Sequence, residues 1–256
     1  SEMCIRDRYH MSVFRLDKYL ADAGLGTRSE VKAYIKKGLV KVNAITVKKP
    51  DIKVNQETDT VEFQGKTISL ATYEYYLLNK PAGYVSATKD NTAPTVLSLI
   101  ESPRKDLFPV GRLDKDTEGL LLITNDGPLS HRLLSPKSHV DKTYYAVVEG
   151  IVDSTDVAVF KQGVNIGDAD LNIAMPAILS VLDTEPDKNL SYINVTIQEG
   201  KFHQVKRMFQ AVGKRVIYLK RTGFGCLTLP EDLASGAYRR LTEEEIAGLH
   251  FSNLKC

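Results

Sequence analysis

The sequence predicts an α+β protein of two parts, a small N-terminal module of two helices and a hairpin, and a larger domain that contains a sheet. Within the first fifty residues, apolar side chains recur at helical spacing and then alternate. From Tyr73 onward, apolar strand-like runs alternate with short helices and turns, without the regular order of a βαβ series. A chain of 256 residues is also near the upper size for one core, which favours a second domain.

Three segments follow from this pattern. Residues 1–10 contain charges and no apolar stretch, so they are not a signal peptide. We interpret them as a non-native or disordered leader ahead of a natural start at Met11. Residues 11–71 hold the small module and its linker, whose last part, from Asn55 to Thr72, mixes strand-like residues with polar turns. Residues 72–256 form the larger domain.

The composition excludes several classes of protein. It is 43% hydrophobic and 26% charged, as in an ordinary globular protein, and no apolar run approaches the roughly 18–20 residues of a membrane span. The three cysteines lie far apart, without metal-ligand spacing or a disulfide framework, which favours a reducing cytoplasm and no bound metal. The net charge is only +2, so attraction for nucleic acid must come from local basic clusters.

The small module begins with a helix from Arg15 to Gly24, where the glycine supplies the stop. A second helix starts at Thr27, which forms a capping-box pattern with Glu30, and ends at Gly38. The chain then alternates across an Asn43-Ala44 turn, which predicts a short hairpin. The apolar residues expected to face the core of this module are Leu16, Tyr19, Leu20, Ala23, Val31, Tyr34, Ile35, Val40, Val42, Ile45 and Val47.

Basic residues form a stripe on this module. Arg28, Lys32 and Lys36 fall at positions i, i+4 and i+8 of the second helix, opposite its apolar face. Arg15 and Lys18 of the first helix add to the stripe. Fixed positive charges at this spacing suit phosphates and release counterions on binding, although a solvated helix face would show the same pattern.

The helix–helix–hairpin pattern, from Arg15 to about Asp59, resembles the alpha-L RNA-binding module first seen in ribosomal small-subunit protein four. The resemblance implies that the basic stripe binds RNA. It implies no chemistry, because many RNA-binding proteins carry this module.

A charged loop leads directly into an apolar strand at residues 111–127, GRLDKDTEGLLLITNDG. Loops at the ends of such strands are where catalytic groups usually lie. This loop holds three acids, Asp114, Asp116 and Glu118, beside Arg112 and Lys115. Taken alone, these residues fit either a metal site or a solvated turn, and they do not single out one acid.

The segment 111–127 resembles the catalytic motif of the RsuA/RluA-type pseudouridine synthases, whose aspartate falls at Asp114. Three further segments match that family in the same order, LLNKPAG at 77–83, KTYYAVVEG at 142–150 and EGKFHQVKRMF at 199–209. The similarity extends from Arg15 to about Ile246. It implies a mixed, largely antiparallel central sheet with helices around it. It also implies isomerisation of a uridine in ribosomal RNA, without a metal, redox cofactor or ATP.

The resemblance assigns catalytic roles to three residues. Asp114 is the essential carboxylate, and Lys206 is the cation that keeps it ionised, because a nearby positive charge lowers the pKa of a carboxyl group. Tyr144 stacks on the uracil and moves a proton. Whether Asp114 attacks C1′, adds to the ring or assists elimination stays open. Tyr145 alternates to the other face of its strand, where we expect it in the core.

Three more residues are expected to bind the substrate. A uridine inside structured RNA must leave its stack before it reacts. The resemblance suggests that Arg112 contacts the backbone or fills the vacated place, unless it pairs with Asp116 or Glu118, the loop-shaping acids. Lys80 is expected to line the same cleft, and Arg207 to contact RNA.

The last motif indicates the RNA target. With Phe202 and His203 before the glutamine, it looks like the RsuA branch, which acts on small-subunit 16S ribosomal RNA; the alternative is 23S RNA. A non-catalytic RNA-binding factor for ribosome assembly is a second interpretation, against which the intact Asp114, Tyr144 and Lys206 argue. A metal-dependent enzyme built on the three loop acids is a third. We expect ribosomal RNA or an assembly intermediate as partner, a cytoplasmic location, no membrane association and a monomer.

Overall fold

The computed structural model describes residues 13–56, 58–68, 73–102, 104–167 and 172–251. The chain divides into two compact units, Ser1–Thr72 and Tyr73–Cys256, and each has its own hydrophobic core. The expected leader at residues 1–10 lies outside the described residues. No helix in the described ranges is long and apolar enough to cross a membrane.

The two helices of the first unit form where the sequence predicts them. α2 (Leu16–Asp22) stops before Gly24, whose φ of +81° is a left-handed conformation that glycine adopts without strain. α3 (Arg28–Lys36) has the complete capping box with Thr27, since each residue of the pair accepts a hydrogen bond from the backbone of the other. The buried core of this unit consists of Leu16, Tyr19, Leu20, Val31, Ile35, Val40, Val54 and Val61.

The predicted hairpin is part of a larger sheet. Its strands, β2 (Val40–Val42) and β3 (Ile45–Thr46), pair across Asn43 and Ala44, which both have the positive φ that a two-residue hairpin turn requires. Two strands of three residues each extend the sheet to the order β3-β2-β5-β6, and a separate pair joins β1 to β4. Strands this short explain why the segment after Asn55 resembled a linker. The additional strands are β1 (Val13–Arg15), β4 (Lys53–Asn55), β5 (Val61–Phe63) and β6 (Lys66–Ile68).

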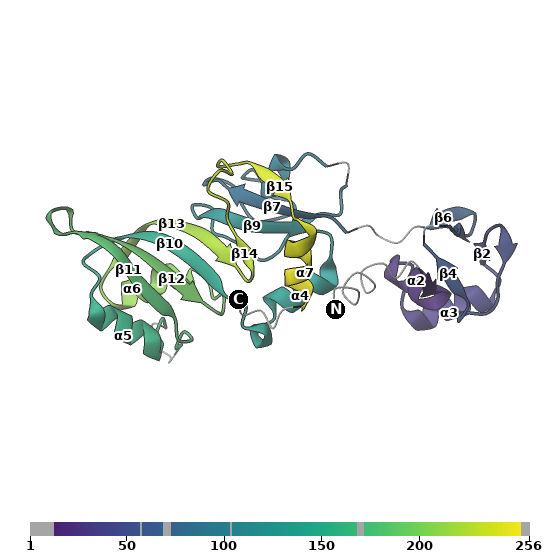
Figure 1. Cartoon of the computed structure of the whole chain (residues 1–256), viewed down its shortest axis with the longest axis horizontal. Helices are drawn as coiled ribbons and strands as arrows, with labels where there is room; N and C mark the ends of the chain where they lie inside the picture. Colours follow the sequence, from purple (N-terminus) through teal and green to yellow (C-terminus); the bar gives the residue numbers. More distant parts are fainter. Residues whose placement is uncertain (1–12, 57, 69–72, 103, 168–171, 252–256) are drawn as a thin grey trace, which may run out of the picture. The chain divides into compact units, whose positions relative to one another are not determined.

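A nine-stranded sheet organises the second unit, with the order β11-β12-β10-β13-β9-β7-β15, while β14 pairs with β13 and β8 with β9 (Figure 1). β9 and β13 run parallel, and the other described pairs are antiparallel. This confirms the expected mixed, largely antiparallel sheet. The strands are β7 (Tyr75–Lys80), β8 (Phe108–Pro109), β9 (Glu118–Thr124), β10 (Lys142–Glu149), β11 (Ile178–Glu185), β12 (Leu190–Ile197), β13 (Arg215–Phe224), β14 (Leu227–Thr228) and β15 (Tyr238–Arg240).

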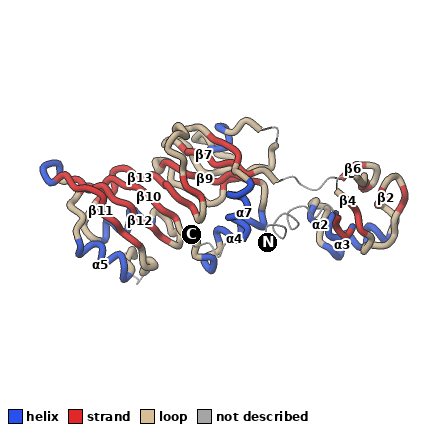
Figure 2. The backbone as a smooth tube through the Cα atoms, viewed as in Figure 1, coloured by secondary structure: helices blue, strands red, loops and turns tan. Residues whose placement is uncertain are grey.

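Helices cover different parts of this sheet (Figure 2). They are α4 (Gly127–Leu134), α5 (Ser154–Gln162), α6 (Gln204–Ala211) and α7 (Glu243–Phe251). Leu120 and Leu122 of β9 pack in one apolar cluster with residues of α4 and α7. Leu121 and Ile123 point into the opposite cluster, which includes residues of α5 and α6. Burial on both faces explains the uninterrupted apolar run of β9.

One close approach between strands sets the position of the charged loop. Gly119 pairs with Arg221 across the parallel β9–β13 contact, and Arg221 in turn pairs with Tyr144 of β10. At Gly119 the φ is +100°, and a Cβ atom would lie 2.2 Å from the carbonyl oxygen of Arg221. The glycine is therefore required for this approach, which brings the loop before β9 beside Tyr144.

Candidate active site

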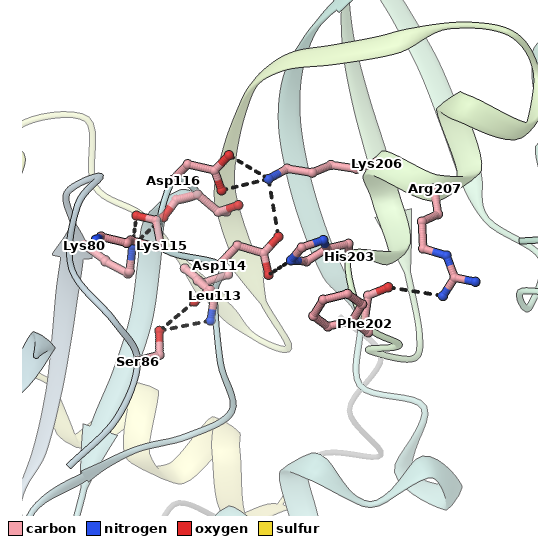
Figure 3. A network of polar contacts seen from close by, with 11 residues as sticks. Lys80, Ser86, Leu113, Asp114, Lys115, Asp116, Phe202, His203, Lys206 and Arg207 are labelled. Carbon is pink, nitrogen blue, oxygen red and sulfur yellow. Dashed lines mark hydrogen bonds and ion pairs between the residues drawn. The ribbon is translucent and has the colours of Figure 1, made fainter. Parts of the chain in front are cut away.

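The charged loop is held in place by two side chains beneath it (Figure 3). The Ser86 hydroxyl accepts a hydrogen bond from the backbone N–H of Leu113 and donates one to its carbonyl, both at 3.0 Å. Lys80, with 0% of its surface exposed, donates to the carbonyl oxygens of Thr117 at 2.7 Å, Pro81 at 3.0 Å and Lys115 at 3.3 Å. Burial lowers the pKa of the Lys80 ammonium group to about 8, against the opposing influence of the nearby acids.

The structure therefore does not bring Lys80 to the cleft, where it was expected to line the wall. Its ammonium group donates to three carbonyl oxygens, because the loop from Lys115 to Thr117 folds over it. Lys80 is a positioning residue for the loop that carries Asp114.

Asp114 faces two basic side chains from the segment around the start of α6. The Nζ atom of Lys206 lies 3.4 Å from Asp114 Oδ2, and the Nε2 atom of His203 lies 3.5 Å from Asp114 Oδ1. Lys206 also lies 2.7 Å from Asp116 Oδ1, so it bridges both carboxylates (Figure 3). This hydrogen bond holds the pKa of Asp116 below its usual value.

The turn before α6 orients these side chains. His203 has a φ of +48°, which turns the backbone sharply at the helix start and directs its ring toward Asp114. The exposed Phe202 ring, with 73% of its surface accessible, stacks on the His203 ring at 3.8 Å between centroids. Arg207 points away from Asp114 and donates to the carbonyl oxygens of Phe202 and Ile166. The helical geometry of α6 thus directs Arg207 away from Lys206.

Tyr144 completes the group. It lies on β10, is 8% exposed, and lines one cavity of about 70 Å³ together with Asp114, Arg112, His203 and Lys206. We name this the Asp114 cavity. Among the described residues, no hydrogen-bond partner is found for the Tyr144 hydroxyl.

The expectation that Tyr145 lies in the core is wrong. Tyr145 is half-buried, and its ring contacts Tyr218 edge to face at 6.2 Å between centroids. It faces the side of β10–β13 opposite α5 and α6, which the described helices leave partly open, whereas Tyr144 faces the core. The prediction that Tyr144 and Tyr145 lie on opposite faces of the strand was correct, but Tyr144, not Tyr145, lies on the face that is packed in the core.

Arg112 is exposed at the mouth of the Asp114 cavity, and within the described ranges it forms no ion pair. The two acids proposed as its alternative partners are engaged elsewhere. Asp116 binds Lys206, and Glu118 Oε2 accepts a hydrogen bond from Tyr218 at 2.8 Å. No three His, Cys, Asp or Glu side chains of the described residues converge as a metal site would require, so the three loop acids do not form one there.

The basic stripe of the first unit is largely exposed. Arg28, Lys32 and Lys36 lie on the solvent side of α3. Two of the five predicted cations form ion pairs with Asp17, whose carboxylate is buried, with 2% of the residue exposed. Arg15 lies 3.1 Å from it, and Lys32 lies 3.9 Å away. Lys18 is placed over the Phe14 ring at 5.9 Å.

Two residues near Asp114, Ser86 and His203, were not assigned to the site from the sequence. Ser86 lies in a loop without a recognisable pattern, and its contact with Leu113 spans 27 positions. His203 lies inside the quoted EGKFHQVKRMF segment, so a histidine directly before a helix that carries the expected cation was an available signal.

Comparisons with known proteins show which families the chain resembles. A family model described as RNA pseudouridylate synthase matches residues 74–211, and a model described as S4 domain matches residues 14–61. A Bacillus subtilis relative named "Uncharacterized RNA pseudouridine synthase YtzG" is 43% identical over 91% of this chain and 96% of its own length. The "Ribosomal small subunit pseudouridine synthase A" of Yersinia pestis is 41% identical over 92% and 97%.

A solved structure is also similar. The "Crystal structure of pseudouridylate synthase" superposes with a TM-score of 0.65 at 37% sequence identity, covering 92% of this chain and 99% of that one.

Proposed function

The chain belongs to the RNA pseudouridylate synthase family, and on this basis we propose that it isomerises one uridine of small-subunit 16S ribosomal RNA. Relatives about 40% identical over more than nine-tenths of their length carry the name ribosomal small subunit pseudouridine synthase A. The Phe202-His203 pair in the last motif supports the same target.

One observation carries the catalytic proposal: a carboxylate, Asp114, lies within 3.5 Å of two basic groups and in the same cavity as Tyr144. The reaction breaks the bond between N1 of uracil and C1′ and forms a bond between C5 and C1′. The proton that leaves C5 is balanced by one taken up at N1. Asp114 acts at this reacting centre, and Lys206 places a positive charge 3.4 Å from its carboxylate.

Tyr144 supplies a flat face for the uracil and a hydroxyl within the same cavity. Arg112, exposed at the cavity mouth and without an ion-pair partner among the described residues, is suited to contact the RNA where the uridine leaves its stack. Phe202 offers an exposed ring at the rim, on which a neighbouring base can stack. Arg207, bonded to backbone carbonyls, supports the turn that presents Phe202.

The first unit contributes affinity in this proposal. S4 domains match residues 14–61, and the exposed cations of α3 provide charges for phosphates. The residues that carry this role are Arg15, Lys18, Arg28, Lys32 and Lys36.

Tritium release from 16S RNA labelled with 5-³H-uridine tests the function, with EDTA present throughout. The parent protein should release tritium, and Asp114→Asn should lower the rate by more than about 10³-fold, as the loss of a catalytic group does in other enzymes. Asp187→Asn, an exposed acid outside the cavity, is the matched control and should behave as the parent.

The same assay is repeated with labelled 23S RNA and with ribosome-assembly particles as substrates. If tritium were released from 23S RNA and not from 16S RNA, the proposed 16S target would be wrong, but the proposed pseudouridine synthase activity would stand. Tight binding to all substrates with no release from any would replace the enzyme with the non-catalytic RNA-binding factor.

A further inference from the structure

A second, larger cavity adjoins the Asp114 cavity. It has a volume of about 470 Å³ and shares four lining residues with the first, namely Arg112, Tyr144, Gly200 and Lys201. Its other wall residues include Lys142, Arg221, Gln198 and Glu199. We name it the Arg221 cavity. Because the two cavities share a wall, a group bound in one lies next to a group bound in the other.

Two buried cations line the Arg221 cavity without a paired acid. Arg221 is 2% exposed and Lys142 is 9% exposed. Arg221 Nε donates to the carbonyl oxygen of Leu120 at 2.7 Å, and Lys142 Nζ donates to that of Val140 at 2.9 Å. Neither forms a salt bridge with any described residue, and the Nη2 atom of Arg221 has no hydrogen-bond partner among them.

Glu199, the carboxylate among the described residues of the cavity wall, forms no ion pair with Lys142 or Arg221. Glu199 accepts hydrogen bonds from the backbone of Met175 at 2.7 Å and from Gln204 at 2.9 Å, and it lies 3.6 Å from Lys201. Burial, and then the neighbouring Arg221, lower the pKa of Lys142 to about 8, although Asp141 and Glu199 oppose this. Both cations lie against the Phe224 ring, Lys142 at 5.8 Å and Arg221 at 5.0 Å from its centroid, but neither has an acid partner among the described residues. Buried cations that lack an opposite charge are costly, so such a pair indicates a site that an anion completes.

We propose that the Arg221 cavity binds a phosphate group of the RNA backbone adjacent to the target uridine, through Lys142 and Arg221. This inference rests on the proposed function. A nucleotide that leaves its stack stays joined to the phosphates on both sides, so one of them must lie close to the cavity that receives the base. Guanidinium and ammonium groups are the side chains that bind phosphate most strongly in proteins.

The buried position of the two cations gives this contact a role beyond affinity. An exposed lysine binds any phosphate that passes, whereas a phosphate held next to Tyr144 fixes the sugar of one nucleotide relative to Asp114. Lys142 and Arg221 are therefore positioning residues for the ribose whose C1′ reacts.

Nuclear magnetic resonance titration with four probes tests this site: 5′-UMP, 3′-UMP, uridine and inorganic phosphate. At least one UMP isomer should bind the parent about tenfold more tightly than uridine, the effect of one charge-assisted contact. Lys142→Met should remove this preference and leave uridine binding unchanged. Lys142→Arg keeps the positive charge and should retain the preference for UMP. Lys161 is an exposed lysine on α5, and the control variant Lys161→Met should also retain this preference.

Arg221→Met is a second variant, and thermal unfolding of each variant shows whether it folds as the parent does. Equal binding of UMP and uridine to the parent would overturn the phosphate site. If inorganic phosphate bound as tightly as UMP, and if this binding depended on Lys142, the cavity would be a site for a free anion. The proposed contact with the RNA backbone would then be wrong.

Tritium release from RNA by the same parent preparation separates this inference from the function. A parent that isomerises RNA but binds UMP and uridine equally keeps the function and loses the phosphate site. A parent that prefers UMP but releases no tritium keeps the anion site and loses the function.

Discussion

The backbone of Arg221 approaches Gly119 so closely that a Cβ atom at Gly119 would lie 2.2 Å from the Arg221 carbonyl oxygen. This contact joins the loop that carries Asp114 to the strand that carries a buried cation. We expect Gly119→Ala to destabilise the second unit by more than about 2 kcal/mol, because the backbone must move and φ is +100°. Urea unfolding measures this. Gly127→Ala, with no atom within 4 Å, should change stability by less than about 0.5 kcal/mol.

Lys206 contacts two carboxylates, and Asp116, at 2.7 Å, is closer than the proposed catalytic Asp114, at 3.4 Å. Lys206→Met should lower the single-turnover rate of tritium release by about 10²-fold or more, because the preorganised positive charge beside Asp114 is lost. Lys206→Arg should restore much of the rate. If the methionine variant were as fast as the parent, the role of Lys206 beside Asp114 would be wrong.

The exposed Phe202 ring predicts a defect in substrate binding. Phe202→Ala should raise the KM for RNA by about tenfold with kcat nearly unchanged, since base stacking on an aromatic ring contributes about 1–3 kcal/mol. Phe202→Tyr should behave as the parent. Ile178→Ala removes an apolar side chain of similar exposure, 70% against 73%, at the sheet edge and serves as the control. An equal effect of both alanine variants would contradict the stacking role.

The buried Lys80 predicts a pH dependence of stability. Its folded pKa of about 8 lies below the ordinary value of 10.5, so the unfolded chain binds more protons between these values. The free energy of unfolding should therefore rise with pH across this window, by at most about 1.4 kcal/mol per pH unit for this group. Unfolding in urea at pH 7.5, 8.5 and 9.5 measures the slope.

In the Lys80→Met variant, the contribution of Lys80 to the rise of the unfolding free energy with pH should be absent. The substitution should also lower kcat more than it changes KM, because three loop carbonyls lose their donor while the cavity lining stays intact. A variant with the parent's slope would show that another group titrates there. Lys142, whose pKa is also about 8, is the first candidate.

The exposed cations of α3 predict the salt dependence of RNA binding. Replacing Arg28 and Lys36 with glutamine should weaken RNA binding and reduce the slope of log K against log salt by about 2. Lys66→Gln on β6 is the control. Lys32 is less suitable for this test, because it lies 3.9 Å from the buried Asp17 and its loss would also affect folding. An unchanged slope would remove the stripe from the RNA interface.

Local patterns predicted a good part of the fold. The capping box at Thr27, the Asn43-Ala44 turn and the apolar run of β9 follow from neighbouring residues, so sequence spacing was sufficient to find them. The segment that holds β5 and β6 was predicted only as a mixture of strand and turn, since three residues give too little alternation to place a strand.

Contacts between distant residues account for what the sequence did not reveal about the site. Lys206 and Asp116 are 90 positions apart, and nothing local indicates that this pair is closer than Lys206 and Asp114. Lys80 was expected to line the cleft, but the loop from Lys115 to Thr117 folds over it. Lys142 and Arg221 line one cavity only because β10 and β13 are neighbours in the sheet.

Asp17 has a consequence for the entropy of RNA binding. Long basic side chains lose rotamer freedom when they dock on a phosphate, and that loss weakens binding. Arg15 is already held by two hydrogen bonds to the buried Asp17 carboxylate, so it is restricted before any RNA is present. Arg28 and Lys36, which have no described partner, must be ordered on contact. If RNA binds this stripe as proposed, Arg15 should lose less rotamer freedom on contact than Arg28 and Lys36.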